Sequence, residues 1–264
     1  MGTGQNALTD TPLLQKLDDR FTVKVPLTDK DVETVTRKTV LEKKPKAITP
    51  IEKKLDQSIG EISRLLDGTD YGFTIADKDT LVADYPILPS TRKFWKKILQ
   101  VIDVAGTSGQ LRSQLRIVDE SVKAVADKEL GSIIPADFIF EQKKYQLIQN
   151  ALLLNDQSNI IEELYSKGGD SALKARILAI TFLIDRLPED TPRFRLKSDK
   201  KTITDLLIDN MNSSTDDFRN KIGSMIDELV NTDKYLIPIG DEYKLQTRVG
   251  VEWEQEFTTQ ASHP

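Results

Sequence analysis

Few residues in this chain of 264 have side chains suited to catalysis. It contains no cysteine, and its one histidine, His263, is the penultimate residue. Thiol nucleophiles, disulfides, Cys/His zinc sites and histidine-based acid–base chemistry therefore lack the side chains that they need. Carboxylate, lysine, serine and arginine chemistry remain. We expect no complete catalytic centre in this chain.

The short motifs that could hold a phosphate or a metal ion are incomplete or lie within predicted helices. The phosphate-binding pattern G-x-x-x-x-G-K-[ST] is absent, and the glycines at residues 2–4 and 106–109 lack both the lysine and a preceding strand. They are typical of a strand exit and a helix cap. In residues 181–185 and 224–228 an acidic residue follows an apolar run, but both lie within helical periodicity. We read these acids as solvent-facing carboxylates and expect no metal or cofactor in this chain.

Basic residues form the clearest candidate binding surface. Two short stretches near the C-terminal end carry them, and phosphate contact needs only such clustered cations. The alternative is a solvated face, and Asp217, Asp227 and Glu228 in the same stretch would oppose a phosphate backbone. Contact with a protein is therefore at least as good a hypothesis as contact with nucleic acid. The candidate residues are Arg193, Arg195, Lys197, Lys200, Lys201, Arg219 and Lys221.

Composition limits the kind of protein further. Charged residues make up 30% of the chain and hydrophobic residues 38%, a balance typical of a folded helical protein rather than a disordered one. A net charge of −5 argues against a surface that binds nucleic acid all over. No apolar run reaches the roughly 20 residues that span a bilayer, and the N-terminus does not resemble a secretory signal. We expect a cytoplasmic protein without a membrane partner.

Hydrophobic periodicity predicts the elements that must position these residues. Alternation predicts a strand over residues 20–27, and helical spacing predicts helices over 30–44 and 50–66. A further helix from Ser90 would bury Phe94, Trp95, Ile98, Leu99 and Ile102, and another follows Gly106. Residues 135–140 begin a helix, and residues 143–154 continue as an apolar stretch that we expect to connect two domains.

The C-terminal part has the most regular pattern. Apolar spacing predicts helices over residues 173–187, around 203–207, and from a cap at Ser214 or Thr215 to Leu229. Two strand-like segments, 235–239 and 242–247, meet at Gly240-Asp241, a dipeptide suited to a tight turn. Three helices followed by a hairpin is the order of a winged helix. The tail from Gly250 has the pattern of a short amphipathic helix.

Several strings together resemble a known family. They are TGQNAL (residues 3–8), DRFTVKVPLTDKDVETVTRKTVLEKKP (19–45), YPILP (85–89), GTSGQLRSQLRIVDE (106–120) and ALKARILAITFLIDRLP (172–188), with YKLQT and VEWEQEF near the end. The chain resembles the P-loop, AAA+-like ATPases of bacterial BREX phage-defence systems, the BrxC/PglY family. Family members are far longer, and the Walker A and Walker B segments of their nucleotide site have no counterpart here.

The resemblance implies a mainly α fold in which a helical AAA+-type lid precedes a winged helix with a β-hairpin wing. Residues 1–27 would be a remnant of the ATPase core, 28–142 the lid, 143–249 the winged helix and 250–264 a tail. Arg20 would be an arginine finger and Arg112 a sensor 2 arginine, with Arg116 as the fallback. For Arg20 the alternative is an ordinary cation at a helix C-terminus. ATP and Mg²⁺ would be bound by the intact family member and not by this chain.

The preferred hypothesis is a lid and winged-helix segment that couples nucleotide state to DNA or protein partners and is not an enzyme by itself. Its partners would be other BREX components and double-stranded DNA, and the intact ATPase would form homo-oligomers, while the oligomeric state of this chain stays open. One alternative is a free-standing winged-helix regulator that binds DNA. Another is a protein–protein assembly module.

Overall fold

A computed structural model describes residues 29–102, 107–188, 195–212, 215–247 and 250, and for residues 29–31 and 107–112 it describes the backbone alone. Contacts divide the chain into two compact units, residues 1–35 and residues 36–264. Every helix and strand from residue 45 onward belongs to the second unit. The strand predicted over residues 20–27 and the tail from residue 251 lie outside the described residues.

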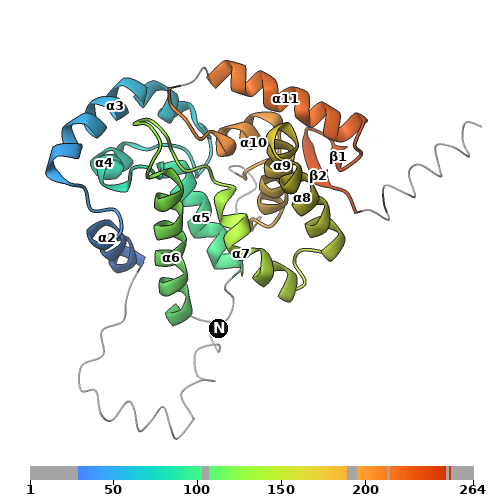
Figure 1. Cartoon of the computed structure of the whole chain (residues 1–264), viewed down its shortest axis with the longest axis horizontal. Coiled ribbons are helices and arrows are strands. Elements are labelled where there is room, and N and C mark those ends of the chain that lie inside the picture. The colour runs from blue at the N-terminus through green and yellow to red at the C-terminus, as the bar shows by residue number, and fades with distance from the viewer. Residues whose placement is uncertain (1–28, 103–106, 189–194, 213–214, 248–249, 251–264) are drawn as a thin grey trace, which may run out of the picture. The chain divides into compact units, whose positions relative to one another are not determined.

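The described chain is mainly helical, as predicted, with one small antiparallel sheet (Figure 1). The elements up to residue 125 are α2 (Asp29–Thr39), α3 (Pro45–Arg64), the 3-10 helix η1 (Ile75–Thr80), α4 (Leu81–Asp84), α5 (Pro89–Ile102) and α6 (Thr107–Val125). After them come α7 (Phe138–Gln149), α8 (Asn155–Lys167), α9 (Gly169–Asp185), α10 (Lys200–Leu207), α11 (Thr215–Asn231), β1 (Leu236–Ile239) and β2 (Glu242–Leu245).

Helix α3 begins earlier than its apolar pattern predicts. Its first residue is Pro45, because the fixed φ angle and missing N–H of proline suit the first position of a helix. Pro50, which was predicted to begin the helix, lies inside it and offers no N–H to the carbonyl of Lys46. The apolar residues Ile51 and Leu55 are buried as expected.

Helix α5 confirms its predicted apolar face. Phe94, Trp95, Ile98, Leu99 and Ile102 are all buried. The indole Nε1–H of Trp95 donates to the backbone oxygen of Ala136 at 2.8 Å, so this polar atom is satisfied inside the core. The periodic signal was sufficient here because one face of the helix is buried and the opposite face carries lysines.

Helix α9 lies at the centre of the C-terminal part and departs from its predicted single stripe. Every residue from Ile177 to Ile184 is buried, so the helix is covered on all sides rather than on one. It contacts α7, α8, α10, α11 and β2. Helix α8, which provides much of this cover, was not predicted, nor were η1 and α4.

The hairpin is confirmed at the predicted place. Leu236 pairs with Leu245 and Ile239 with Glu242, so Gly240 and Asp241 form a two-residue turn in which Gly240 has φ of 61°. A positive φ at this turn position favours glycine. The backbone N–H of Tyr243 also donates to the carbonyl of Ser198 at 2.9 Å, which ties β2 to the segment before α10.

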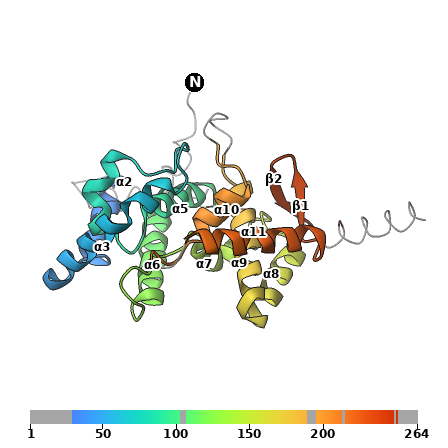
Figure 2. The ribbon, with the colours of Figure 1, turned by 90° about the horizontal axis from the view of Figure 1, so that it is seen from above.

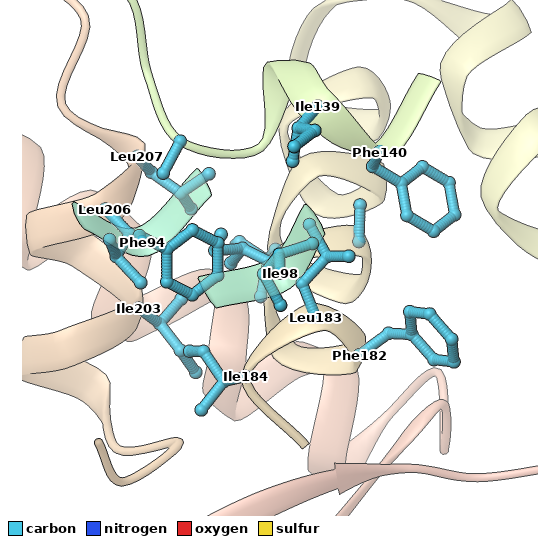
Figure 3. Close-up of a cluster of buried hydrophobic side chains, with 14 of the residues drawn as sticks. Phe94, Ile98, Ile139, Phe140, Phe182, Leu183, Ile184, Ile203, Leu206 and Leu207 are labelled. Carbon is cyan, nitrogen blue, oxygen red and sulfur yellow. The ribbon is translucent and has the colours of Figure 1, made fainter. Parts of the chain in front are cut away.

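The hydrophobic core is continuous across the predicted domain boundary. Residues 142 and 143 both lie within α7, and the apolar stretch after them belongs largely to this helix, in which Leu147 is fully buried. Phe94 and Ile98 of α5 share one cluster with Ile203 of α10 (Figure 3). The division into a lid and a winged helix stays a prediction, and so does the role of residues 143–154 in connecting them. None of the described helices is long and apolar enough to span a membrane.

Candidate functional site

The candidate binding surface is built on α10 and α11, which lie side by side with β1 at the far end of α11 (Figure 2). Helix α10 begins at an N-cap, Asp199, whose carboxylate accepts the backbone N–H of Thr202 at 2.7 Å. Helix α11 carries acidic residues in its first turn, where the helix dipole favours them. Its buried stripe consists of Ile222, Met225, Ile226 and Leu229.

The exposed cations of this surface are held by carboxylates of the same chain. Lys200 Nζ lies 2.6 Å from Asp227 Oδ1, which joins α10 to the outer face of α11. Lys221 Nζ lies 2.8 Å from Asp170 Oδ1 at the start of α9. Arg195 is paired with Glu242 of β2. A phosphate backbone would have to displace these carboxylates before it could use the cations.

The acidic residues of α11 are paired as well. Glu228, and Asp233 just after the end of the helix, both lie within 2.8 Å of Lys174 Nζ, which projects from α9. Asp227 is the partner of Lys200. On the outward face of α11, positive and negative side chains are therefore joined in ion pairs, and neither sign of charge dominates. Such a face gives no long-range attraction to a polyanion.

A buried carboxylate, Asp205, forms the junction behind this face. Its Oδ1 lies 3.1 Å from Arg219 Nη2 of α11, and its Oδ2 lies 3.0 Å from Lys201 Nζ. The same Oδ2 accepts the backbone N–H of Leu66, just after α3, at 3.1 Å. The Asp205 side chain is fully buried, so its charge is stable only with these partners. This one side chain joins the end of α3 to both α10 and α11.

Arg219 extends the junction toward α3. Its Nη1 lies 3.5 Å from Asp216 and 3.9 Å from Glu61 of α3. Lys200, Lys201 and Arg219 also line a hollow of 470 Å³ between α10 and α11. Because the carboxylates of Asp205, Asp216 and Asp227 already pair with these three cations, the hollow is not a strong anion site.

A second buried junction centres on Arg176 of α9. Its guanidinium forms two hydrogen bonds with Asp137, at 2.9 and 3.2 Å, and one with Asp209 at 3.0 Å. It also donates to the carbonyl of Leu207 at the end of α10. Burial alone would lower the pKa of the guanidinium, but the Asp137 and Asp209 carboxylates outweigh it and the pKa is raised. This cluster fixes α9 against the start of α7 and the end of α10.

The structure brings together part of the predicted site. Lys200, Lys201 and Arg219 line one hollow. Arg195 pairs instead with Glu242 of β2, and Lys221 with Asp170 at the start of α9. Lys197 is exposed in the segment just before α10, and no ion pair involves it in the described part of the chain. Arg20 and Arg193 lie outside the described residues, so their predicted roles stay predictions.

The two lid arginines lie elsewhere. Arg112 lies on α6, where only the backbone is described, and Arg116 follows one turn later with an exposed side chain. Helix α6 contacts α7, and no described contact joins Arg116 to the cations of α10 and α11. Among the described residues no group of three or more Asp, Glu, His or Cys could hold a metal ion. The predicted sensor role of either arginine stays a prediction.

Sequence reasoning missed the two buried junctions. Asp205 lies among the apolar residues Ile203, Leu206 and Leu207 of α10, and Arg176 directly precedes Ile177 in the apolar helix α9. A charged residue inside an apolar run is the signal that could have identified both, because such a residue needs a buried partner. The partner itself is distant in sequence and could not have been named.

Comparison of the chain with protein-family models, with curated proteins and with solved structures finds no match.

Proposed function

We propose that this chain is a non-catalytic coupling module in which α9, α10, α11 and the hairpin form a winged helix that docks on a protein. The helices before it would act as the lid of a BREX-type ATPase, as the sequence resemblance implies. The module would transmit nucleotide state from an ATPase core to a partner of the defence complex. The observation that carries the proposal is the ion-paired outer face of α11.

Protein docking suits this face better than DNA binding does. Affinity for duplex DNA depends on cations that are free to replace counterions at the phosphates. Lys200, Lys221 and Arg195 each have a carboxylate partner instead. A neutral surface with paired charges can still select a protein whose charges complement it.

Coupling is supported by the Asp205 junction. The carboxylate contacts Leu66 after α3, Lys201 of α10 and Arg219 of α11. A displacement of α3 therefore acts directly on the helix that presents the docking face. In the proposed module α3 belongs to the lid and α11 to the winged helix.

The test is a titration of the purified chain against labelled duplex DNA, followed by fluorescence anisotropy at low salt, about 50 mM. The proposal expects no saturable binding. Binding that is saturable and weakens steeply with salt would favour the alternative, a winged-helix DNA-binding regulator, for which the unpaired Lys197 is the supporting observation.

The BREX part of the proposal has its own tests. The reading frame upstream of Met1 is expected to encode a Walker A segment, since the family carries its nucleotide site there. The purified chain is expected to turn over no ATP in the presence of Mg²⁺. Turnover by the chain alone would contradict the proposal, because none of the sequence patterns that hold phosphates is present.

A further inference from the structure

A cavity of 530 Å³ lies away from α10 and α11. Three segments line it: the start of α3 with the residues before it, the Tyr85-Pro86 pair, and the end of α6 with the residues after it. Its volume lies within the range of about 300–1,000 Å³ that small-molecule sites occupy. The apolar part of the lining includes Leu41, Ile51, Pro86, Val122, Val125 and Leu130.

Three lysines stand at this cavity without an acidic partner. Lys46 and Lys128 are exposed, and their side chains make no hydrogen bond or ion pair in the described part of the chain. Lys43 Nζ donates to the backbone oxygens of Leu41 and Ala83. An ammonium has three donors, so one N–H of Lys43 remains for a ligand. The cations of α10 and α11, in contrast, are almost all paired.

Neither acidic residue that lines the cavity forms an ion pair with these lysines in the described part of the chain. The Glu129 carboxylate accepts a hydrogen bond from Asn210 Nδ2 at 3.3 Å and is thus directed at the Asn210 side chain. Glu42 is exposed and makes no ion pair with the lysines among the described residues. Asp84, which lies close enough to Lys43 to act on its charge, is held by Arg37 at 2.5 Å and by Arg92 at 3.4 Å.

The Lys43 ammonium is poorly compensated in its surroundings. Burial lowers its pKa to about 8, and the attraction of Asp84 offsets this only in part. A cation held in a partly apolar site without an ion-pair partner is stabilised by any anion that reaches it. The apolar lining and this unpaired charge together specify the complementary ligand.

We propose that this cavity binds a small molecule with an apolar body and one anionic head group, such as an aryl or alkyl carboxylate. The apolar body lies against Leu41, Ile51 and Val122. The head group is bound by Lys46 and Lys128 at the rim and by the remaining N–H of Lys43. This site is independent of the proposed docking face on α11.

The test uses 1-anilinonaphthalene-8-sulfonate, an apolar dye with one anionic group, titrated into the full chain. We expect a saturable rise in fluorescence with one site per chain, and displacement of the dye by 2-naphthoate but much less by the uncharged 2-naphthalenemethanol. Binding without saturation, or equal displacement by both compounds, would overturn the proposal.

Two variants locate the dye in the cavity. The double variant Lys46→Glu/Lys128→Glu is expected to weaken dye binding about tenfold or more, because attraction at the rim becomes repulsion. Ala126→Trp is expected to abolish binding by filling the cavity, since Ala126 is an exposed residue of its lining. The matched control is Lys44→Glu, which changes an exposed lysine that does not line the cavity. Near-UV circular dichroism and urea unfolding establish that each variant is folded. If folded variants bind as tightly as the wild type, the site is elsewhere and the proposal is wrong.

The pH dependence of dye affinity gives a second readout. Above pH 8 the Lys43 ammonium loses its proton, so affinity is expected to fall several-fold between pH 7 and pH 9. The other titratable groups at the cavity are Glu42, Glu129, Tyr85, Lys46 and Lys128, and beyond Lys43 lies Asp84 with its partners Arg37 and Arg92. Lys43→Met is expected to remove this pH dependence. A pH profile unchanged by Lys43→Met would contradict the role assigned to that ammonium.

Discussion

Arg219 of α11 and Asp205 of α10 form an ion pair of 3.1 Å in which the carboxylate is fully buried. The same carboxylate accepts the backbone N–H of Leu66 and pairs with Lys201. Two helices and the end of a third therefore depend on one acidic side chain. A charge so placed is costly unless all its partners remain.

Replacing Asp205 by Asn is expected to destabilise the fold by about 1–3 kcal/mol. The loss falls below the usual cost of breaking a buried pair because Arg219 and Lys201 are themselves partly exposed and keep some hydration. Urea unfolding measures the change. Asp216→Asn, at an exposed residue of the same network, serves as the control and should shift the free energy of unfolding by less than about 0.5 kcal/mol. Equal effects of the two substitutions would refute the central role of Asp205.

Replacing Arg176 by Met is expected to cost about 3 kcal/mol, because Asp137 would remain buried without its guanidinium partner. Adding Asp137→Asn to this variant should recover part of the loss, since the uncompensated charge is then removed. Thermal and urea unfolding of the two single variants and the double variant complete the cycle. Strictly additive losses would show that the two side chains do not interact in the folded protein.

The loss of folding stability at low pH should depend on Asp77. Burial alone would raise the pKa of this carboxyl, but hydrogen bonds from Lys93 and Thr74 outweigh it and the pKa lies below its usual 3.8. Since the folded pKa is depressed, the stabilisation is present above about pH 4 and is lost as the pH falls through the lower folded value. The difference in unfolding free energy between wild type and Asp77→Asn is therefore expected to shrink below pH 4. A difference independent of pH from 6 to 2.5 would rule out this linkage.

Removing carboxylates from the outer face of α11 should create affinity for DNA. In the double variant Asp227→Asn/Glu228→Gln, Lys200 loses its carboxylate partner and becomes available to phosphates, while Lys174 keeps only Asp233. Weak binding to duplex DNA is expected to appear at low salt. The logarithm of its association constant should fall linearly with the logarithm of the salt concentration, with a slope of about 0.9 for each cation that contacts a phosphate. The control Asp127→Asn/Asp241→Asn changes two exposed acids that have no partner among the described residues, so it matches the double variant in charge. If the double variant and the control behave alike, ion pairing is not what suppresses DNA binding.

The periodic pattern predicted most helices and the hairpin because each was decided locally. The apolar face of α5 and the stripe of α11 repeat at helical spacing, and Gly240-Asp241 is a turn dipeptide wherever it occurs between strands. Helix α8 was missed, and α9 was predicted as an amphipathic surface helix. The apolar positions of α9 extend around the whole helix, and only its neighbours show that all of them are covered.

The sequence predicted which residues belong to the candidate site, but not that their charges are ion-paired. The clustering of Lys200, Lys201, Arg219 and Lys221 could be seen in the sequence, and their charges suggested phosphate contact. Asp227 and Asp170, the partners of Lys200 and Lys221, lie on other helices than these lysines. Asp205, the partner of Lys201, is buried. A sequence lists charges without the distances between them, and the Coulomb energy depends on those distances.

The sequence by itself determined that this chain is mainly helical with a C-terminal hairpin, and that it lacks cysteine, a placed histidine and a phosphate-binding loop. These properties depend on residue types and on spacing along the chain. Only the tertiary structure decided that Asp205 and Arg176 each join several elements, that the cations of α10 and α11 are ion-paired, and that Lys43, Lys46 and Lys128 line the same cavity. Charge neutralisation and cavity formation arise between residues that are far apart in sequence, and only folding brings them within reach of each other.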